Sequence, residues 1–371
     1  MIFFLSLALI LVVYAGYPLC IVMLSRLRSK SLIDPSAMLH WPSVSVVCAV
    51  HDEAHRVSAK IDNLAAQAYP GPMQIIFVSD GSTDETEQRL RADSRVQTFG
   101  YPQRRGKAHA INLGVANASG DVVVFTDARQ ELSDGAIAIL AAQLSAEDVG
   151  VVSGTLVHRD PKTHQARSIG LYWRYERSIR DAESRWYSTV GATGALYAIR
   201  RQEYVPIEAD TILDDFEIPM NIIRRGRRAL IDPRACVYDE LQHDVRGERI
   251  RKIRTLTGNF QSLARHPWMC SPRANPVFWQ LLLHKVMRLF VPYALLALWL
   301  SSGLARSPLL RDFFWLQTGI YALVAVSYLY APLRRLPGVS FLVVFVDLNV
   351  AAVQALMRFI GAESTARWEK A

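Results

Sequence analysis

The stretch SVSVVCAVHDE (residues 43–53) decides the fold, because a valine-rich run ends abruptly in two acidic residues. The run predicts a buried strand over 43–50. The same alternation continues along the chain, with strands predicted at 74–79 and 121–126 and helices at 54–68 and 83–91. Short buried strands that alternate with helices predict an α/β fold with a mostly parallel sheet covered on both faces.

Acidic residues follow three of the predicted strands directly. Asp52 and Glu53 follow the first strand, Asp80 the second and Asp127 the third. One such aspartate commonly caps the next helix. Several at one sheet edge, where ligands bind in parallel sheets, form a negative crevice. A divalent metal and a sugar nucleotide would neutralise it.

The first 24 residues are apolar and uncharged, which predicts a transmembrane helix over 1–24. Arg26, Arg28 and Lys30 come after this stretch and no basic residue precedes it. This order favours an anchor over a cleaved signal peptide. Positive charge on the following flank places the central domain in the cytoplasm, against the inner or plasma membrane.

Further apolar stretches at 289–304, 313–330 and 339–360 predict a C-terminal transmembrane region of about three helices over 289–362. The basic loop with Arg334 and Arg335 then lies inside, and the last stretch crosses outward. That stretch carries polar residues that are costly in lipid, so it either faces other helices or lies in the interface.

Residues 270–288 precede this region and mix His284, Lys285 and Arg288 with apolar residues. The pattern predicts an interfacial amphipathic helix on the inner membrane surface. A charged helix end that snorkels is the equal alternative.

The net charge of +8 and the four scattered cysteines narrow the function classes. Without a CxxC pair, the cysteines indicate neither a zinc site nor a disulfide framework, which fits a reducing compartment. Positive charge suits an anionic lipid surface and a diphosphate substrate. We expect no nucleic-acid role, since a basic module with interleaved aromatic residues is missing.

Seven motifs occur in an order and spacing that resemble a known family. They are SVVCAVHDEA (45–54), VSDGSTD (78–84), RGKAHAIN (105–112), FTD (125–127), GATGALYAIR (191–200), LDDF (213–216) and RKIRTLTGN (251–259). Together they resemble family 2 glycosyltransferases with the GT-A fold, in the membrane-integrated branch that includes cellulose, chitin and hyaluronan synthases. The resemblance implies a Rossmann-like GT-A domain over 40–265.

The resemblance also implies how a nucleotide-diphosphate sugar, expected to be a UDP-sugar, would bind. Asp52, Glu53 and Asp80 would accept hydrogen bonds from the uracil and ribose. Lys107 sits in the basic loop RRGK (104–107), from which its ammonium group would approach the diphosphate.

Asp127 matches the first aspartate of the family's DxD motif, which the resemblance assigns to Mg²⁺ or Mn²⁺. Here the motif reads Asp127-Ala128-Arg129, and an arginine cannot bind a cation. A second ligand must come from elsewhere or be water, or Arg129 contacts the phosphates directly.

Two later motifs carry the expected catalytic and product-side residues. Asp215, with its neighbour Asp214, matches the family's catalytic acidic position, and Asp215 is the expected base for inverting transfer. The family's QxxRW motif appears with Arg251 and Arg254 but has Thr255 in place of the tryptophan. Threonine offers no flat stacking face for a sugar, which argues against processive synthesis.

The sequence therefore predicts a membrane-bound inverting glycosyltransferase that extends a glycan acceptor in cell-envelope or exopolysaccharide synthesis. Two alternatives remain open: a polyprenyl-phosphate glycosyltransferase that makes a lipid-linked sugar, and a catalytically silent membrane subunit of a synthase complex. Expected partners are the nucleotide sugar, a glycan or lipid-linked acceptor and membrane lipids. With so few spans, a polymer would need oligomerisation or a separate exporter.

Overall fold

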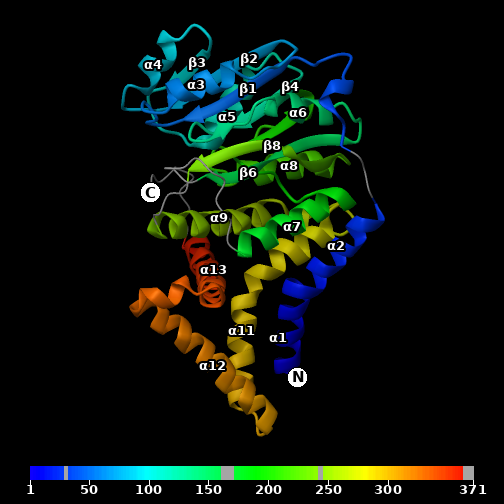
Figure 1. Ribbon diagram of the computed structural model, residues 1–371, viewed down its shortest axis with the longest axis vertical. Helices are drawn as coiled ribbons and strands as arrows, with labels where there is room; N and C mark the ends of the chain where they lie inside the picture. Colours follow the sequence, from blue (N-terminus) through cyan, green and yellow to red (C-terminus); the bar gives the residue numbers. More distant parts are fainter. Residues whose placement is uncertain (29–31, 160–170, 241–244, 362–371) are drawn as a thin grey trace.

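The computed structural model describes residues 1–28, 32–159, 171–240 and 245–361. Its strands form one sheet at one end of the molecule, and long apolar helices extend from the other end (Figure 1). The N-terminal helix α1 lies beside α11 from the C-terminal region, so the two ends of the chain share one helical layer.

The sheet has eight strands in the order β3-β2-β1-β4-β7-β6-β8-β5. Their bounds are β1 Val44–Val50, β2 Met73–Asp80, β3 Gln97–Tyr101, β4 Val122–Thr126, β5 Glu131–Leu132, β6 Val149–Arg159, β7 Leu196–Arg200 and β8 Arg228–Glu240. Strands β3, β2, β1 and β4 are parallel, β7 is antiparallel to β4 and β6, and β6 pairs with β8 in parallel. The predicted α/β fold with a mostly parallel sheet is confirmed.

Helices cover both faces of this sheet. They are α3 Val57–Ala65, α4 Thr86–Ala92, α5 Lys107–Ala116, α6 Ala136–Gln143 and α8 Asp214–Arg224. Val46 packs in a core with Leu64 of α3, whereas its neighbour Val47 packs in a second core with Ile111 of α5. Because successive strand residues face opposite sides, all seven residues of β1 are buried.

Four helices among the described residues are long and apolar enough to cross a membrane. The first is Ile2–Leu27, built from α1 Ile2–Leu11, the π-helical turn η1 Val12–Gly16 and α2 Tyr17–Leu27. The second is Phe278–Gly303, built from α10 Phe278–Leu281, the π-helical turn η5 Leu282–Val286 and α11 Met287–Gly303. The others are α12 Pro308–Leu329 and α13 Pro337–Ile360.

The part of the predicted interfacial segment from residue 278 onward is continuous with the apolar helix that follows it. Its placement at the membrane surface remains a prediction, as do the domain limits 1–24, 40–265, 270–288 and 289–362. Residue 362, the last of these limits, lies outside the described residues.

Two amphipathic helices separate the sheet from the apolar helices. They are α7 Leu171–Trp186 and α9 Val245–Arg265, and both lie across the middle of the molecule (Figure 1). Ala351 and Ala355 of α13 are buried against Ile253 of α9. The sequence predicts that the last apolar segment either faces other helices or lies in the interface. In the structure this segment, α13, packs against another helix. Short 3-10 turns complete the chain: η2 Pro35–Ala37, η3 Arg201–Glu203, η4 Pro267–Cys270 and η6 Ala331–Arg335.

Candidate active site

The structure gathers the strand-terminal carboxylates at one edge of the sheet, as the topology requires. β1, β2 and β4 are neighbours and parallel, so the residues after them, Asp52, Asp80 and Asp127, lie at the same edge. Helix α8 begins at Asp214 and brings a fourth carboxylate to this group through its ion pair with Lys107.

Asp80 is almost completely buried, at 1% exposure, and its carboxylate holds the basic loop in place. Oδ1 accepts hydrogen bonds from the Tyr101 hydroxyl at 2.9 Å, the Arg105 amide at 2.7 Å and the Gly106 amide at 2.9 Å. Since α5 begins at Lys107, Asp80 fixes where this lysine starts its helix. The contact with the nucleotide that the sequence leads us to expect for Asp80 stays a prediction.

Asp52 and Glu53 are held by the turn that follows β2. Asp52 Oδ1 accepts from the Thr83 amide at 2.7 Å, and the Glu53 amide donates to Thr86 Oγ1 at 2.7 Å. Asp52 has φ 50, a left-handed conformation that aspartate tolerates better than most residues. Glu53 pairs with Arg56 at 2.7 Å. Both acidic residues therefore lie at the site edge with their carboxylates already engaged.

Lys107 bridges two carboxylates at the centre of the site. Its Nζ lies 2.9 Å from Asp127 Oδ1 and 3.4 Å from Asp214 Oδ2. Burial alone would lower the pKa of Lys107, but Asp127 and Asp214 outweigh burial and raise it. The lysine is therefore a fixed positive charge in a crevice that also contains carboxylates.

Asp214 and Asp215 point to different surroundings, as expected for adjacent residues at a helix start. Burial raises the pKa of Asp214 to about 6; Lys107 opposes this shift, while Asp215 and Asp127 add to it. Asp215 Oδ2 instead lies 2.7 Å from the position that a Cβ on Gly194 would occupy. Any side chain at Gly194 would therefore displace Asp215 from this position.

Arg129, which replaces the second DxD aspartate, pairs with Asp239 of β8. Its Nη2 lies 2.7 Å from Asp239 Oδ2, and Gln130 Nε2 donates to the same oxygen at 3.3 Å. Sequence reasoning missed Asp239, which lies one residue before the end of β8. Tyr101, which anchors Asp80, was also missed.

The donor set around Asp127 fits a divalent cation with one protein ligand. Its side chain is 32% exposed, and Oδ1 carries the contact with Lys107. Mg²⁺ is often held by one carboxylate together with substrate phosphates and water, so Asp127 is sufficient as the protein's contribution. No cluster of three or more acidic, histidine or cysteine side chains suited to a metal occurs among the described residues.

The two arginines of the last motif lie on α9. Arg254 Nη2 donates to the Ile212 carbonyl at 3.5 Å, just before α8, and its Nε is buried without a hydrogen-bond partner. Its charge acts on Asp214. Arg251 lies almost one turn earlier on the same helix and is partly buried. The structure therefore brings Arg254 toward the carboxylates.

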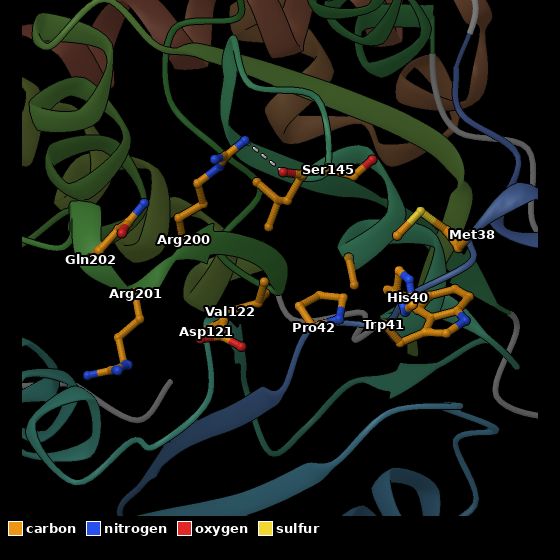
Figure 2. A pocket seen from close by; sticks show the side chains of 12 residues that line it. Met38, His40, Trp41, Pro42, Asp121, Val122, Ser145, Arg200, Arg201 and Gln202 are labelled. Carbon is orange, nitrogen blue, oxygen red and sulfur yellow. Dashed lines mark hydrogen bonds between the residues drawn. The ribbon is translucent and has the colours of Figure 1, made fainter.

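A cavity of about 460 Å³ lies at the edge of the sheet opposite these carboxylates. Asp121, just before β4, lines it together with Trp41 and Arg200 (Figure 2). The guanidinium of Arg200 donates to the Leu144 carbonyl at 2.8 Å and to that of Ala146 at 2.7 Å. The Arg200 guanidinium is therefore already hydrogen-bonded to the backbone. Ligands of parallel sheets bind at the edge where the strands end, so the edge that carries Asp80 and Asp127, here called the carboxylate edge, is the better candidate for the active site.

Comparison with known proteins agrees with this geometry. Residues 45–205 match the family model "Glycosyl transferase family 2". An N-acetylglucosaminyltransferase of Mesorhizobium japonicum is 28% identical over 192 residues, which cover 50% of this chain and 44% of the relative. A poly-beta-1,6-N-acetyl-D-glucosamine synthase of Staphylococcus epidermidis is 23% identical over 65% of this chain and 60% of its own. The chain thus spans about half the length of such relatives.

Among solved structures, mannosyltransferase PcManGT from Pyrobaculum calidifontis, in complex with GDP-Man and Mn²⁺, has a TM-score of 0.73. It is 23% identical and the match covers 98% of this chain and 100% of that one, so the likeness extends through the apolar helices. The expected family and fold are confirmed for the matched region: residues 45–205 form a family 2 glycosyltransferase domain related to that of the polysaccharide synthases, and the fold is GT-A.

Proposed function

We propose that this chain is a membrane-anchored inverting glycosyltransferase that uses a nucleotide-diphosphate sugar and transfers the sugar to a glycan acceptor. The observation that carries the proposal is the cluster of Lys107, Asp127 and Asp214 at the carboxylate edge, with Asp215 next to it. A structural role would not require a buried lysine between two carboxylates beside a third.

Each group of the cluster has a distinct task in this proposal. The Lys107 ammonium offsets negative charge on the donor diphosphate, and Arg254 adds a second positive charge behind Asp214. Asp127 would hold Mg²⁺ or Mn²⁺, which stabilises the leaving nucleotide diphosphate when bound. Asp80 acts indirectly, because it fixes the loop from which Lys107 projects.

Asp215 is the proposed base. It takes the proton from the acceptor hydroxyl as that oxygen forms a bond to the anomeric carbon. The bond between that carbon and the diphosphate oxygen breaks at the same time, and the nucleotide diphosphate leaves with the electron pair. Attack opposite the leaving group inverts the anomeric configuration. Asp214 is less suited, because its carboxylate already faces Lys107.

The names of the relatives suggest which donor to test first. Several are N-acetylglucosaminyltransferases and one is a poly-beta-1,6-N-acetyl-D-glucosamine synthase, so UDP-N-acetylglucosamine is the preferred donor. GDP-mannose is the second donor to test, because its use would contradict the expectation of a UDP-sugar. Thr255 stands where the family's QxxRW motif has a tryptophan, which supports transfer of single sugars over processive polymerisation.

The decisive experiment measures nucleotide release by the purified full chain with each donor, with Mg²⁺, Mn²⁺ or EDTA. We expect Asp215→Asn to lower turnover by about 100-fold or more, because general-base catalysis contributes at least that factor. Asp134→Asn, an exposed aspartate outside the site, is the matched control and should keep full activity. Unchanged release in Asp215→Asn would remove the catalytic assignment of Asp215, whereas no release by the wild-type chain with any donor would favour the silent-subunit alternative.

A further inference from the structure

A second polar cavity lies between the sheet-bearing domain and the apolar helices. It has a volume of about 240 Å³ and is lined from α7, α9, the two π-helical turns and α13. Figure 1 shows α7 and α9 above α11 and α13 at this level. π-helical turns are rare and often mark functional sites, and here η1 contributes Tyr14 while η5 contributes His284 and Lys285.

This cavity adjoins Asp215, the proposed catalytic base. Ala192, which lines it, donates its amide to the Asp215 carbonyl at 2.8 Å. The Lys285 ammonium lies 4.5 Å from the centre of the Phe216 ring, directly after Asp215 in the chain. A ligand in the cavity would therefore lie next to the residue that we propose as the base.

The cavity holds more positive than negative groups. Its lining carries Arg180, His284, Lys285 and Arg288 against two carboxylates, Glu176 and Glu183. His284 contacts both carboxylates, with Nδ1 2.8 Å from Glu183 and Nε2 3.2 Å from Glu176. Carboxylates only accept, so a histidine held between two of them donates from both nitrogens and is positively charged.

The two carboxylates are fully engaged within this network. Glu176 also pairs with Arg288, and Glu183 also accepts from the Tyr17 hydroxyl at 2.5 Å. Burial would raise the pKa of Glu176, but its bonds to His284 and the charge of Arg288 lower it to about 2. Both acidic groups are thus satisfied by the protein itself.

The other two cations, Lys285 and Arg180, form no ion pair within hydrogen-bond distance among the described residues. Lys285 contacts the Phe216 ring, and Arg180 donates to the Thr193 hydroxyl at 3.2 Å. Arg288 Nε and Nη2, both hydrogen-bond donors, are buried without hydrogen-bond partners. Buried unsatisfied donors beside unpaired cations indicate an anionic ligand, since leaving them empty is costly.

We propose that this cavity binds the phosphate headgroup of the membrane lipid that carries the acceptor. The inference rests on the proposed function and names the class of its acceptor. Leu289 of α11 and Leu348 and Ala352 of α13 line the same cavity, so its wall combines apolar side chains with the cations. An amphipathic lipid phosphate matches both parts, whereas a soluble anion would not need the apolar wall.

The test measures binding of a radiolabelled polyprenyl monophosphate to the full chain in phosphatidylcholine nanodiscs. We expect saturable binding that Lys285→Met weakens about 10-fold or more, because a hydrogen bond to a charged group is lost. Arg185→Gln, an exposed cation on the same helix as Arg180, is the matched control and should bind as the wild type does. Lys285 forms no ion pair with the carboxylates of the described residues, so we expect Lys285→Met to keep a melting temperature close to that of the wild type.

Competition experiments decide the source of the anion. Polyprenol of the same chain length should not compete, and phosphatidate and inorganic phosphate should compete only weakly. Equal competition by any of these, or full binding by Lys285→Met, would overturn the proposal. Nucleotide diphosphate binding, followed by thermal shift, should remain in Lys285→Met. If Lys285→Met no longer binds the nucleotide diphosphate, the cavity belongs to the donor site and the lipid proposal is overturned. If the wild-type protein binds no nucleotide diphosphate, the proposed function fails while the lipid-binding result still stands.

Discussion

At the residue scale, Asp214 is a buried carboxylate whose ionised form the fold disfavours. Its folded pKa is raised to about 6, above the ordinary 3.8, mainly by burial. The folded state therefore binds this proton more tightly than the unfolded state does. The cost to stability is fully present above about pH 6 and disappears as the pH falls toward 4.

We therefore predict that Asp214→Asn stabilises the protein at pH 7.5 by about 1–3 kcal/mol, since asparagine has no charge to bury. Lys107 keeps its contact with Asp127 in this variant. The difference in melting temperature from wild type should shrink steadily between pH 6 and pH 4. The exposed control Asp134→Asn should show no such trend. A variant less stable than wild type at pH 7.5 would mean that Lys107 needs both carboxylates.

At the element scale, three strands were predictable because continuous runs of β-branched residues are typical of buried strands. These strands, β1, β2 and β4, begin and end within one residue of the predicted bounds. The antiparallel strand β7 was not predicted, because strand direction depends on partners distant in sequence. The same limit applies to the hydrogen bonds by which Asp80 holds the loop before α5. A strand-terminal aspartate looks alike whether it faces a ligand or a loop, and the Arg105 and Gly106 amides that bind it lie 25 and 26 residues away.

The loop before α5 also permits a matched test of its role. Gly81 has φ +61, and a Cβ there would lie 2.5 Å from the Arg104 amide nitrogen. Gly135 has φ +69 with nothing within 4 Å of its Cβ position. Alanine at either site should cost about 1–2 kcal/mol of stability for the left-handed backbone. Only Gly81→Ala should also displace the Lys107 loop and raise the KM for the donor.

Denaturant unfolding and donor KM measured on both variants separate the two effects. If Gly135→Ala raises KM as much as Gly81→Ala does, the loss would follow from general destabilisation. If neither raises it, the loop would not position Lys107 for the donor.

At the scale of the whole molecule, the packing of α13 bears on its topology in the membrane. Its second half lies against α9, through Ala355 with Ile253 and the stacked rings of Phe359 and Phe260. α9 in turn reaches the sheet-bearing domain through Arg254. The end of α13 should therefore lie on the same side of the membrane as that domain, which differs from the outward crossing expected from the charge pattern alone.

Single-cysteine labelling tests this placement in a background without the native cysteines Cys20, Cys48, Cys236 and Cys270. With the domain cytoplasmic, Ile360→Cys should react with a membrane-impermeant maleimide only from the cytoplasmic side. Leu304→Cys, in the turn between α11 and α12 farthest from the sheet, should react only from outside (Figure 1). Both positions are exposed, at 74% and 86%, so access is limited by side and not by burial. Labelling of Ile360→Cys from outside would show that α13 crosses the bilayer and that its packing on α9 does not hold in the membrane.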